Sequence, residues 1–286
     1  MKLSTEIGSA AGIVGEERAI EYIAKAGFDA WDFTMFNMRK YSWENRCFLE
    51  GHPLSTPNYL EFTKKLDKIG RDCGIVCNQA HAPFPSDLVG IDYLKRAIEC
   101  AAEVGAKICV VHPRNLATPQ QNAEMYCDLL PFAKQHHVKI AVENMWCWDK
   151  GAEHSTFAAC ATGESFLAHL EAVNDPDLVA CLDLGHAEMR GSGDGAARMI
   201  RTLGGKHLQA LHIHDNDLLH DSHQIPFSMS IDFAAVAAAL REIRYAGDLT
   251  LEADAYLSAF DASNIFEGIR NLYSAAKRFA DLFTAS

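Results

Sequence analysis

Short runs of apolar, often β-branched residues alternate along the chain with longer stretches in which apolar residues recur every three or four positions. A strand repeats its buried face every two residues and a helix about every 3.6, so the short runs predict strands and the longer stretches predict helices. In the stretch 92–104, one buried helical face is marked by Leu94, Ala97, Ile98 and Ala101. The predicted strands cover residues 3–7, 30–35, 75–81, 107–112, 139–143, 178–183, 209–214 and 248–252.

The predicted helices lie between these strands, at residues 16–26, 59–73, 92–104, 120–136, 164–173, 195–203, 233–243 and 262–282. Strict alternation of strand and helix indicates a parallel sheet with helices outside it. Eight such units predict an α/β fold, a single (β/α)8 TIM barrel of eight parallel strands that forms one domain over residues 1–286. Glycine favours the left-handed conformation that ends a helix, and we expect it in that role at Gly27, Gly74, Gly105 and Gly247.

An open, doubly wound sheet is the alternative fold. It is disfavoured because no G-x-G-x-x-G phosphate-binding motif follows the first strand. The stretch Gly191-Ser192-Gly193 follows the sixth predicted strand, and we interpret it as a loop.

Two connections, residues 36–56 and 145–162, are longer than is usual between elements of a compact domain. Both carry aromatic residues, as a substrate lid would, although surface decoration or an oligomer contact would explain them as well. The aromatic residues are Tyr41, Trp43, Trp146 and Trp148.

Composition narrows the class of protein. Of the 286 residues, 49% are hydrophobic and 22% are charged, which is typical of a globular protein. The formal charge of −12 disfavours nucleic acids and anionic membranes as partners. No apolar run is long enough to cross a bilayer, the first residues lack a signal-peptide pattern, and the nine cysteines form no CxxC pair. We therefore expect a cytoplasmic protein with reduced thiols.

Potential metal ligands close six successive predicted strands. Barrel enzymes place their chemistry at the carboxyl ends of the strands, so these side chains are expected to meet at one mouth. A lone histidine or carboxylate would more often be a hydrogen-bonded core residue or a helix N-cap. The six residues are His81, His112, Glu143, Asp183, His212 and Glu252.

The N-cap interpretation fits Glu143 and Glu252 poorly, because each directly follows three apolar or β-branched residues and is therefore expected inside the barrel. Two buried carboxylates that face one mouth need a cation or a proton between them. We therefore predict one divalent metal with Glu143, Asp183, His212 and Glu252 as ligands. Mixed carboxylate and imidazole ligands suit Mn²⁺, Co²⁺, Zn²⁺ or Fe²⁺, and Mg²⁺ stays open; a structural zinc site is disfavoured because no cysteine is among them.

Four stretches resemble the metal-binding motifs of the xylose-isomerase-like TIM barrel superfamily: VEN at 142–144, LDLGH at 182–186, LHIHD at 211–215 and LEA at 251–253. That superfamily includes sugar isomerases, ketose 3-epimerases, inosose dehydratases and the apurinic-site nuclease endonuclease IV. The resemblance implies that Glu143 and Glu252 act as the acid/base pair beside a metal-polarised carbonyl, and that His186 binds substrate. The epimerases have an arginine six residues after the histidine ligand, where this chain has Leu218, which leaves the grip on the substrate in doubt.

The resemblance to endonuclease IV extends to residues that bind further metal ions there. We expect these residues to bind substrate or additional metal, and they are His81, His112, His186, Asp221 and His223. DNA cleavage is disfavoured because Lys and Arg are absent from the loops 82–90 and 216–231, and the loop after the fifth strand has only Lys150.

Together these features predict a metal-dependent isomerase or epimerase of a sugar or polyol, in carbohydrate metabolism. A dehydratase of a keto-inositol or keto-sugar is the alternative at the same site. Less favoured are an apurinic-site endonuclease and a barrel that binds sugar without catalysis. The expected partner is a small molecule, with neither nucleic acid nor membrane, and a homo-oligomer stays open.

Overall fold

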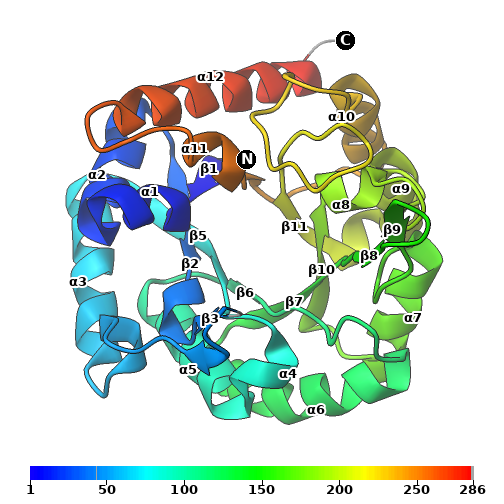
Figure 1. Cartoon of the computed structure of the whole chain (residues 1–286), viewed down its shortest axis with the longest axis horizontal. Coiled ribbons are helices and arrows are strands. Elements are labelled where there is room, and N and C mark those ends of the chain that lie inside the picture. Colours follow the sequence, from blue (N-terminus) through cyan, green and yellow to red (C-terminus); the bar gives the residue numbers. More distant parts are fainter. Residues whose placement is uncertain (43, 285–286) are drawn as a thin grey trace.

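A computed structural model of the chain describes residues 1–42 and 44–284. Eight parallel strands form one sheet that curves into a ring, and long helices surround it (Figure 1). Each strand begins and ends within two residues of its predicted bounds. The strands are β1 (Leu3–Glu6), β2 (Ala30–Thr34), β5 (Val76–His81), β6 (Ile108–Val110), β7 (Lys139–Glu143), β10 (Leu178–Asp183), β11 (Leu208–His212) and β12 (Leu249–Leu251).

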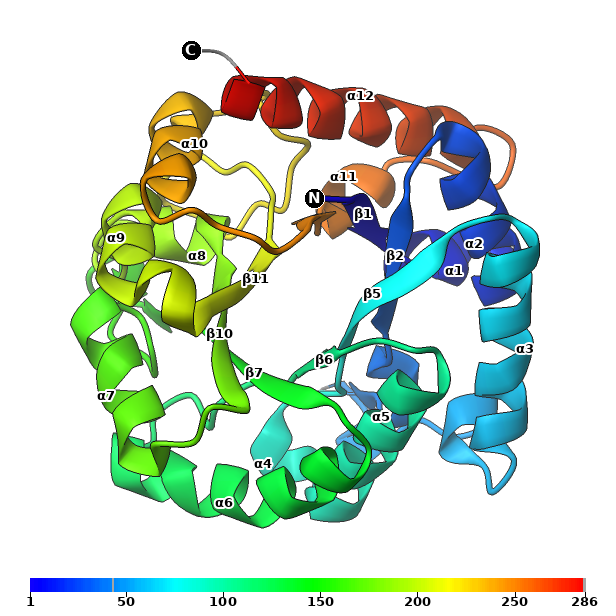
Figure 2. The same cartoon turned by 180° about the vertical axis from the view of Figure 1, so that it is seen from behind.

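The ring closes between β11 and β12. An isolated bridge joins Ile213 to Leu251, with backbone hydrogen bonds from Ile213 N to Thr250 O (2.9 Å) and from Glu252 N to Ile213 O (3.0 Å). On the other side of β12, β1 pairs with both β12 and β2, so the first strand completes the ring beside the last (Figure 2). The predicted (β/α)8 barrel is therefore confirmed, and the open doubly wound sheet is excluded.

The outer helices follow the predicted pattern. They are α2 (Glu16–Ala26), α3 (Tyr59–Asp72), α5 (Ile91–Glu103), α6 (Pro119–Gln135), α7 (Gly163–Val173), α9 (Ala196–His207), α10 (Phe233–Glu242) and α12 (Ile265–Thr284). Helix α6 starts sharply because Thr118 caps Gln121 N while the Gln121 side chain caps Thr118 N, with Pro119 in the first turn. No helix within residues 1–42 and 44–284 is long and apolar enough to cross a bilayer.

Three of the four expected glycine caps adopt the left-handed conformation: φ is +111° at Gly27, +79° at Gly74 and +76° at Gly105. The expectation for Gly247 is wrong. Helix α10 ends at Glu242, and Arg244 takes the left-handed conformation there with φ +54°. At position 247 a glycine leaves room for the side chain of Tyr245, because a Cβ there would lie 2.3 Å from the Tyr245 hydroxyl.

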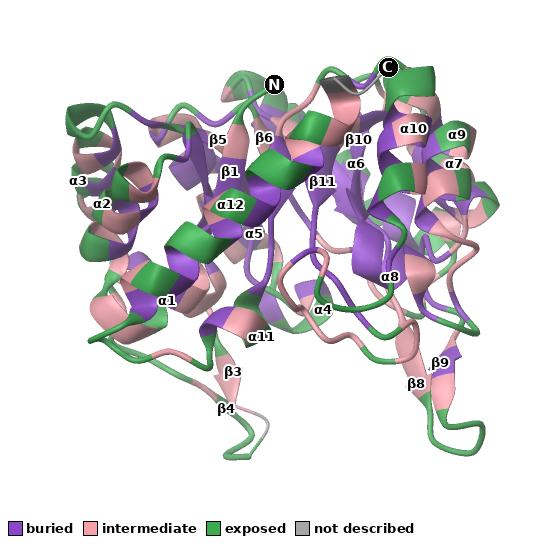
Figure 3. Ribbon diagram, turned by 90° about the horizontal axis from the view of Figure 1, so that it is seen from above, coloured by how far each residue is buried: buried purple, intermediate pink, exposed green. Residues whose placement is uncertain are grey.

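The loops that follow the strands contain short elements that the sequence pattern did not predict. Four short helices come directly or soon after a strand: α1 (Gly8–Val14), α4 (Ser86–Val89), α8 (Leu184–Glu188) and α11 (Asp254–Leu257). The two long connections each fold back as a hairpin, β3 (Tyr41–Ser42) with β4 (Cys47–Phe48), and β8 (Cys147–Asp149) with β9 (His154–Thr156). Both hairpins project from the same end of the barrel (Figure 3). Trp43, expected on the first of them, lies outside the described residues.

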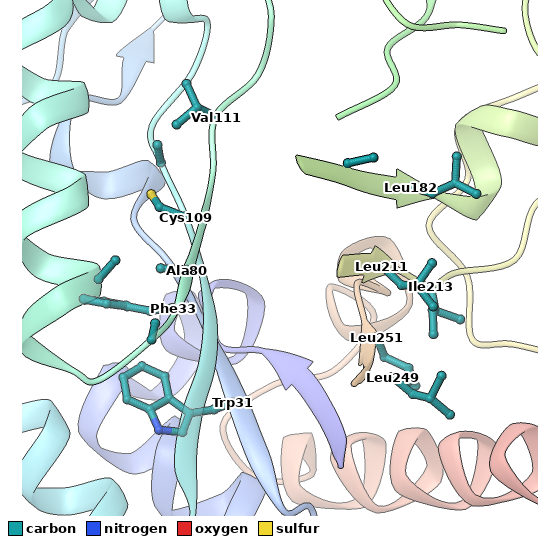
Figure 4. Close-up of a cluster of buried hydrophobic side chains, with 14 of the residues drawn as sticks. Trp31, Phe33, Ala80, Cys109, Val111, Leu182, Leu211, Ile213, Leu249 and Leu251 are labelled. Atoms are coloured by element: carbon teal, nitrogen blue, oxygen red, sulfur yellow. The ribbon is translucent and has the colours of Figure 1, made fainter. Parts of the chain in front are cut away.

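Alternate residues along each strand face the helices or the barrel interior. Figure 4 shows the helix-facing set, which includes Trp31 and Phe33 on β2 and Leu249 and Leu251 on β12. The residues that alternate with the helix-facing ones form a second, smaller cluster of buried side chains. This cluster consists of Val110, Ala141, Val179, Cys181 and Ala210. Polar residues at the same alternation, such as Asp32, therefore point into the barrel.

Candidate metal centre

The residues that close the strands share the inward-facing alternation. Glu143, Asp183 and His212 are the last residues of β7, β10 and β11, and all three are buried. Strand register brings them together, because Asp183 pairs with His212, and Glu143 pairs with Cys181 two residues before Asp183. Glu252 follows β12, across the closing seam from His212. The structure thus brings all four predicted ligands to one place.

The four ligands are close enough to share one ion. One side-chain ligand atom from each of Glu143, Asp183, His212 and Glu252 lies within 4.8 Å of every other. Nδ1 of His212 lies between two carboxylates, 3.2 Å from Oε1 of Glu143 and 3.3 Å from Oε2 of Glu252. This is a compact donor set of oxygen and nitrogen.

Two predicted histidines extend the group along one side. Nε2 of His112 lies 3.2 Å from Oε2 of Glu143, and Nε2 of His81 lies 3.6 Å from the same oxygen. The Nε2 atoms of the two histidines are 2.8 Å apart. Nδ1 of His81 also lies 3.6 Å from Oε1 of Glu252. His81 thus lies against both glutamates, and Glu143 belongs to three overlapping groups of potential ligand atoms, one of which includes Cys181.

On the other side lies a second group, and it contains a residue without a predicted role. Asp221 lies 3.3 Å from Nε2 of His186 and 3.1 Å from Nε2 of His223, as the sequence led us to expect. His214 joins them: its Nε2 lies 3.6 Å from Asp221 and 3.0 Å from Oδ1 of Asp183. His214 is two residues after His212, so strand alternation could have indicated that both point the same way.

Gly185 makes room for His214. A Cβ at position 185 would lie 1.9 Å from Cε1 of His214, far closer than any real contact. The glycine in the LDLGH stretch therefore permits the imidazole to lie between Asp183 and Asp221. The ring also stacks on His223, with ring centroids 3.9 Å apart.

Backbone carbonyl oxygens hold two of these imidazoles in place. Nδ1 of His186 lies 2.8 Å from the carbonyl oxygen of Asn144, and Nδ1 of His223 lies 2.9 Å from that of Glu252. In each case Nε2 is left to face Asp221. Metal-binding histidines have this arrangement, in which one ring nitrogen is held so that the other is presented to the ion.

Buried atoms without partners test whether a cation fits. Within the part of the chain that the structure describes, Oε2 of Glu143, Oδ2 of Asp183 and both ring nitrogens of His212 are buried and have no hydrogen-bond partner. Nδ1 of His81 and Oδ1 of Asp221 are in the same condition. Such groups are costly to bury unless something satisfies them. These carboxylate and imidazole donors match the preferences of a divalent transition metal.

The pKa values of the two glutamates are shifted in opposite directions. Burial alone would raise the pKa of Glu143, but the imidazoles of His212 and His112 hold it well below its usual range. Burial raises the pKa of Glu252 well above its usual range; His212 opposes this shift and the charge of Glu143 adds to it. The two carboxyl groups are therefore unequal, because the surroundings of Glu143 favour its charged form and those of Glu252 disfavour it.

The pKa values in the group of His186 and Asp221 are also strongly shifted. Burial lowers the pKa of His186, but the carboxylates of Asp183 and Asp221 outweigh it and raise the pKa to about 10. Burial raises the pKa of Asp221, but His186 and His223 hold it far below its usual value.

A cavity of about 740 Å³ opens onto these residues. Its polar wall includes His81, Glu143, His186 and Glu252, and its aromatic wall consists of Phe36, Phe84, Trp146 and Trp148. Two of the aromatic residues expected on a lid thus line the cavity, whereas Tyr41 packs on Phe48 within its own hairpin. Leu218, which stands where the epimerase motif has an arginine, packs against the hydrophobic core and is absent from the described lining of this cavity.

Comparison with known proteins assigns the family. Residues 20–275 match the description "Xylose isomerase-like TIM barrel", and the chain belongs to that family. It is 26% identical to the protein MJ1311 of Methanocaldococcus jannaschii over 254 residues, which cover 82% of this chain and 78% of that protein.

Two solved structures are similar in fold. A D-tagatose 3-epimerase-like protein superposes with a TM-score of 0.72 at 20% identity, covering 99% of this chain and 98% of that one. A 3-keto-D-glucoside 4-epimerase of E. coli superposes with a TM-score of 0.68 at 17% identity, covering 97% and 99%. The fold of this family is therefore shared along the whole chain.

Proposed function

We propose that the protein is a metal-dependent epimerase or isomerase of a ketose, a related keto sugar or a polyol. One observation carries the proposal: two buried carboxylates from different strands, Glu143 and Glu252, flank the same imidazole at the floor of the cavity. Around the ring, β10 and β11 stand between β7 and β12 on one side, and β6, β5, β2 and β1 on the other. A substrate between the two glutamates would be approached from two directions.

The proposed ligands of the metal are Glu143, Asp183, His212 and Glu252, with the predicted identities Mn²⁺, Co²⁺, Zn²⁺, Fe²⁺ or Mg²⁺. A divalent cation, when bound, supplies a Lewis acid that polarises the substrate carbonyl and makes the neighbouring C–H more acidic. The unsatisfied atoms of Glu143, Asp183 and His212 support this assignment, as does the resemblance of the surrounding motifs to the family.

The two glutamates would move the proton. A carboxylate oxygen of one glutamate removes the proton from the carbon next to the carbonyl, and the carboxyl group of the other returns a proton to the opposite face. In the reverse reaction the roles exchange. His81 lies against both glutamates, so it would help to hold the two carboxyl groups apart and in place.

Substrate would be held by the residues around this pair. His81, His112 and the group of His186, Asp221 and His223 would bind substrate hydroxyls or additional metal ions. Trp146 and Trp148 line the cavity and would cover a sugar ring. The ring of Trp148 stacks on His220 of the loop after β11, with centroids 5.5 Å apart, so the loops after β7 and β11 are in contact with each other.

Solvent exchange tests the proposal. Metal content is measured first on the purified protein, and ketoses and inososes are then incubated with it in deuterium oxide. We expect deuterium to enter at the carbon beside the carbonyl, an epimer or isomer to appear, and a chelator to abolish both. A product lighter by one water would assign the dehydratase alternative, since proton removal is common to both reactions. Saturable sugar binding without exchange would indicate a non-catalytic barrel and reject the proposal.

A further inference from the structure

The cavity at the metal centre continues sideways into a groove of about 860 Å³ between the loops that follow β5 and β6. The two spaces share walls, and the residues common to both are Phe84, His112, Asn115, Met145 and Cys147. They therefore form one cleft with two halves. Only the half beneath the aromatic residues Trp146 and Trp148 reaches Glu143 and Glu252.

We propose that the groove is a subsite for a second, uncharged sugar unit, so that the substrate is a glycosylated keto sugar rather than a free monosaccharide. The inference rests on the proposed function, because it takes the reacting unit to lie at Glu143 and Glu252. The size of the cleft is the first argument. A complete small-molecule site takes roughly 300–1,000 Å³. The cavity at the metal centre already reaches that size, and the groove adds a second space of the same order.

The apolar wall of the groove is the second argument. Phe84, Leu88 and Leu116 are 42%, 41% and 75% exposed, and all three line this groove. Large apolar side chains that gather at one concave place mark a binding surface, because exposed apolar area is otherwise unfavourable. Phe84 stands at the junction of the two halves, with its ring stacked on His112 at 5.0 Å between centroids. Its position suits contact with the apolar face of a sugar ring.

The polar groups of the groove decide what kind of unit it takes. Hydrogen-bonding side chains also line it, among them Asp87, Arg114, Gln121 and Glu124. Two carboxylates against one guanidinium leave a negative balance, and the whole chain carries −12. A phosphate or carboxylate group would be repelled, whereas sugar hydroxyls can both donate to carboxylates and accept from the arginine.

Binding and turnover of matched sugars test the subsite. Protein loaded with Mn²⁺ or Co²⁺ is titrated calorimetrically with D-fructose and with the reducing glucosyl-fructoses, which carry glucose on each ketose hydroxyl in turn. Deuterium exchange is measured on the same set. We expect at least one glucosyl-fructose to bind about tenfold more tightly than D-fructose, or about 1.4 kcal/mol.

Substitutions then test whether the tighter binding of the glucosyl-fructose depends on the groove. Leu116→Asp should remove this gain in affinity and leave D-fructose unchanged, since Leu116 lines the groove and not the cavity at the metal centre. Leu49→Asp is the matched control, an exposed leucine that lines neither half, and should change nothing.

Each other result is decisive. Glucosyl-fructoses that bind no better than D-fructose, or a Leu116→Asp variant that weakens both alike, would overturn the subsite. A change of oligomeric state in Leu116→Asp without a change in glycoside binding would mean that the groove is covered by a second copy of the chain, which also overturns it. Exchange on D-fructose without a glycoside gain rejects the subsite alone. Tight glycoside binding without exchange rejects the epimerase and keeps the subsite, and binding of neither sugar rejects both.

Discussion

Oδ2 of Asp32 lies 3.4 Å from Nε2 of His212, on the side of the imidazole away from Glu143 and Glu252. Both side chains are fully buried. The same carboxylate oxygen accepts a hydrogen bond from Nε2 of Gln79 at 2.9 Å, and Gln79 accepts one from the Thr250 hydroxyl at 3.3 Å. A carboxylate behind a metal-binding histidine fixes the ring and the position of its proton.

Asp32→Asn should therefore weaken metal binding without removing a ligand. The expected loss is about 10- to 100-fold in metal affinity, as is usual when such a partner is lost. Competition with a chromogenic chelator measures it, with Asp72→Asn, an exposed aspartate on α3, as the control. An unchanged affinity in Asp32→Asn would show that the carboxylate has only a structural role.

Glu143→Gln and Glu252→Gln separate acid/base chemistry from metal binding. Glutamine keeps the volume and one oxygen, so metal should be weakened and not abolished. Loss of a general acid or base lowers turnover by about 10²- to 10⁴-fold. Turnover and solvent deuterium exchange are measured at increasing metal concentration. Full recovery of either variant with excess metal would leave the ligand assignment standing and remove the acid/base assignment.

Gly185→Ala should displace His214 from Asp183 and Asp221, because the new Cβ would overlap the imidazole. Overpacking of this kind costs about 1–3 kcal/mol in the free energy of unfolding. Denaturant titration measures the loss. Gly12→Ala is the matched control: no atom lies within 4 Å of a Cβ there, and the residue is inside α1. That substitution should stabilise the fold by about 0.4–1 kcal/mol. Equal effects at the two positions would contradict the packing argument.

Glu6 gives a pH dependence of stability. Its carboxyl group is buried at the end of β1, and burial raises its pKa from 4.5 to about 7. The folded chain therefore holds a proton that the unfolded chain has released between these values, so the free energy of unfolding falls as the pH rises from 4.5 to 7. The fall due to Glu6 is on the order of 3 kcal/mol.

Denaturation curves of the wild type and Glu6→Gln across this range isolate the contribution of Glu6. Glutamine keeps an oxygen to accept from Ser9 N, which now donates to Oε2 at 3.0 Å. The variant should lose stability less steeply with pH than the wild type, whereas Glu61→Gln, at an exposed position, should follow the wild type. Parallel curves for Glu6→Gln and wild type would mean that Glu6 titrates alike in both states.

Nucleic acid should not bind. The charge of −12 and the absence of Lys and Arg from loops 82–90 and 216–231 leave no clamp for phosphates beside the site. We expect no change in fluorescence anisotropy of an abasic duplex at physiological salt. Incision of that duplex, lost in His212→Ala, would place the protein with the nuclease branch instead.

The strand ends could be predicted because their residues are local signals. Glu143 and Asp183 follow apolar runs directly, and barrel topology then determines that they meet. Asp32 could not be found in this way, since it lies in the middle of a strand between Trp31 and Phe33. Its alternation says that it faces away from them, but whether that side is the interior depends on closure of the ring. Glu6 does end a strand, and the rule applied to β1 would have found it.

The positions of the loops relative to the site could not be predicted from the sequence either. The aromatic residues of 145–162 were visible, yet their approach to the site depends on a contact made far along the chain, from Trp146 Nε1 to Oδ2 of Asp221 at 3.0 Å. Local periodicity carries no information on such a pair. The left-handed backbone of Arg244, with φ +54°, is similar, because arginine as a residue type does not favour that conformation as glycine does.

The bridge between Ile213 and Leu251 forms a seam in the ring. His212, the last residue of β11, and Glu252, which follows β12, lie on opposite sides of this seam. An ion bound by both residues would join the two sides of the seam. Ion binding and closure of the barrel would then be thermodynamically linked, since an ion that binds only the closed ring stabilises it by mass action. Any local opening of the ring at this seam would become rarer as the free ion concentration rises.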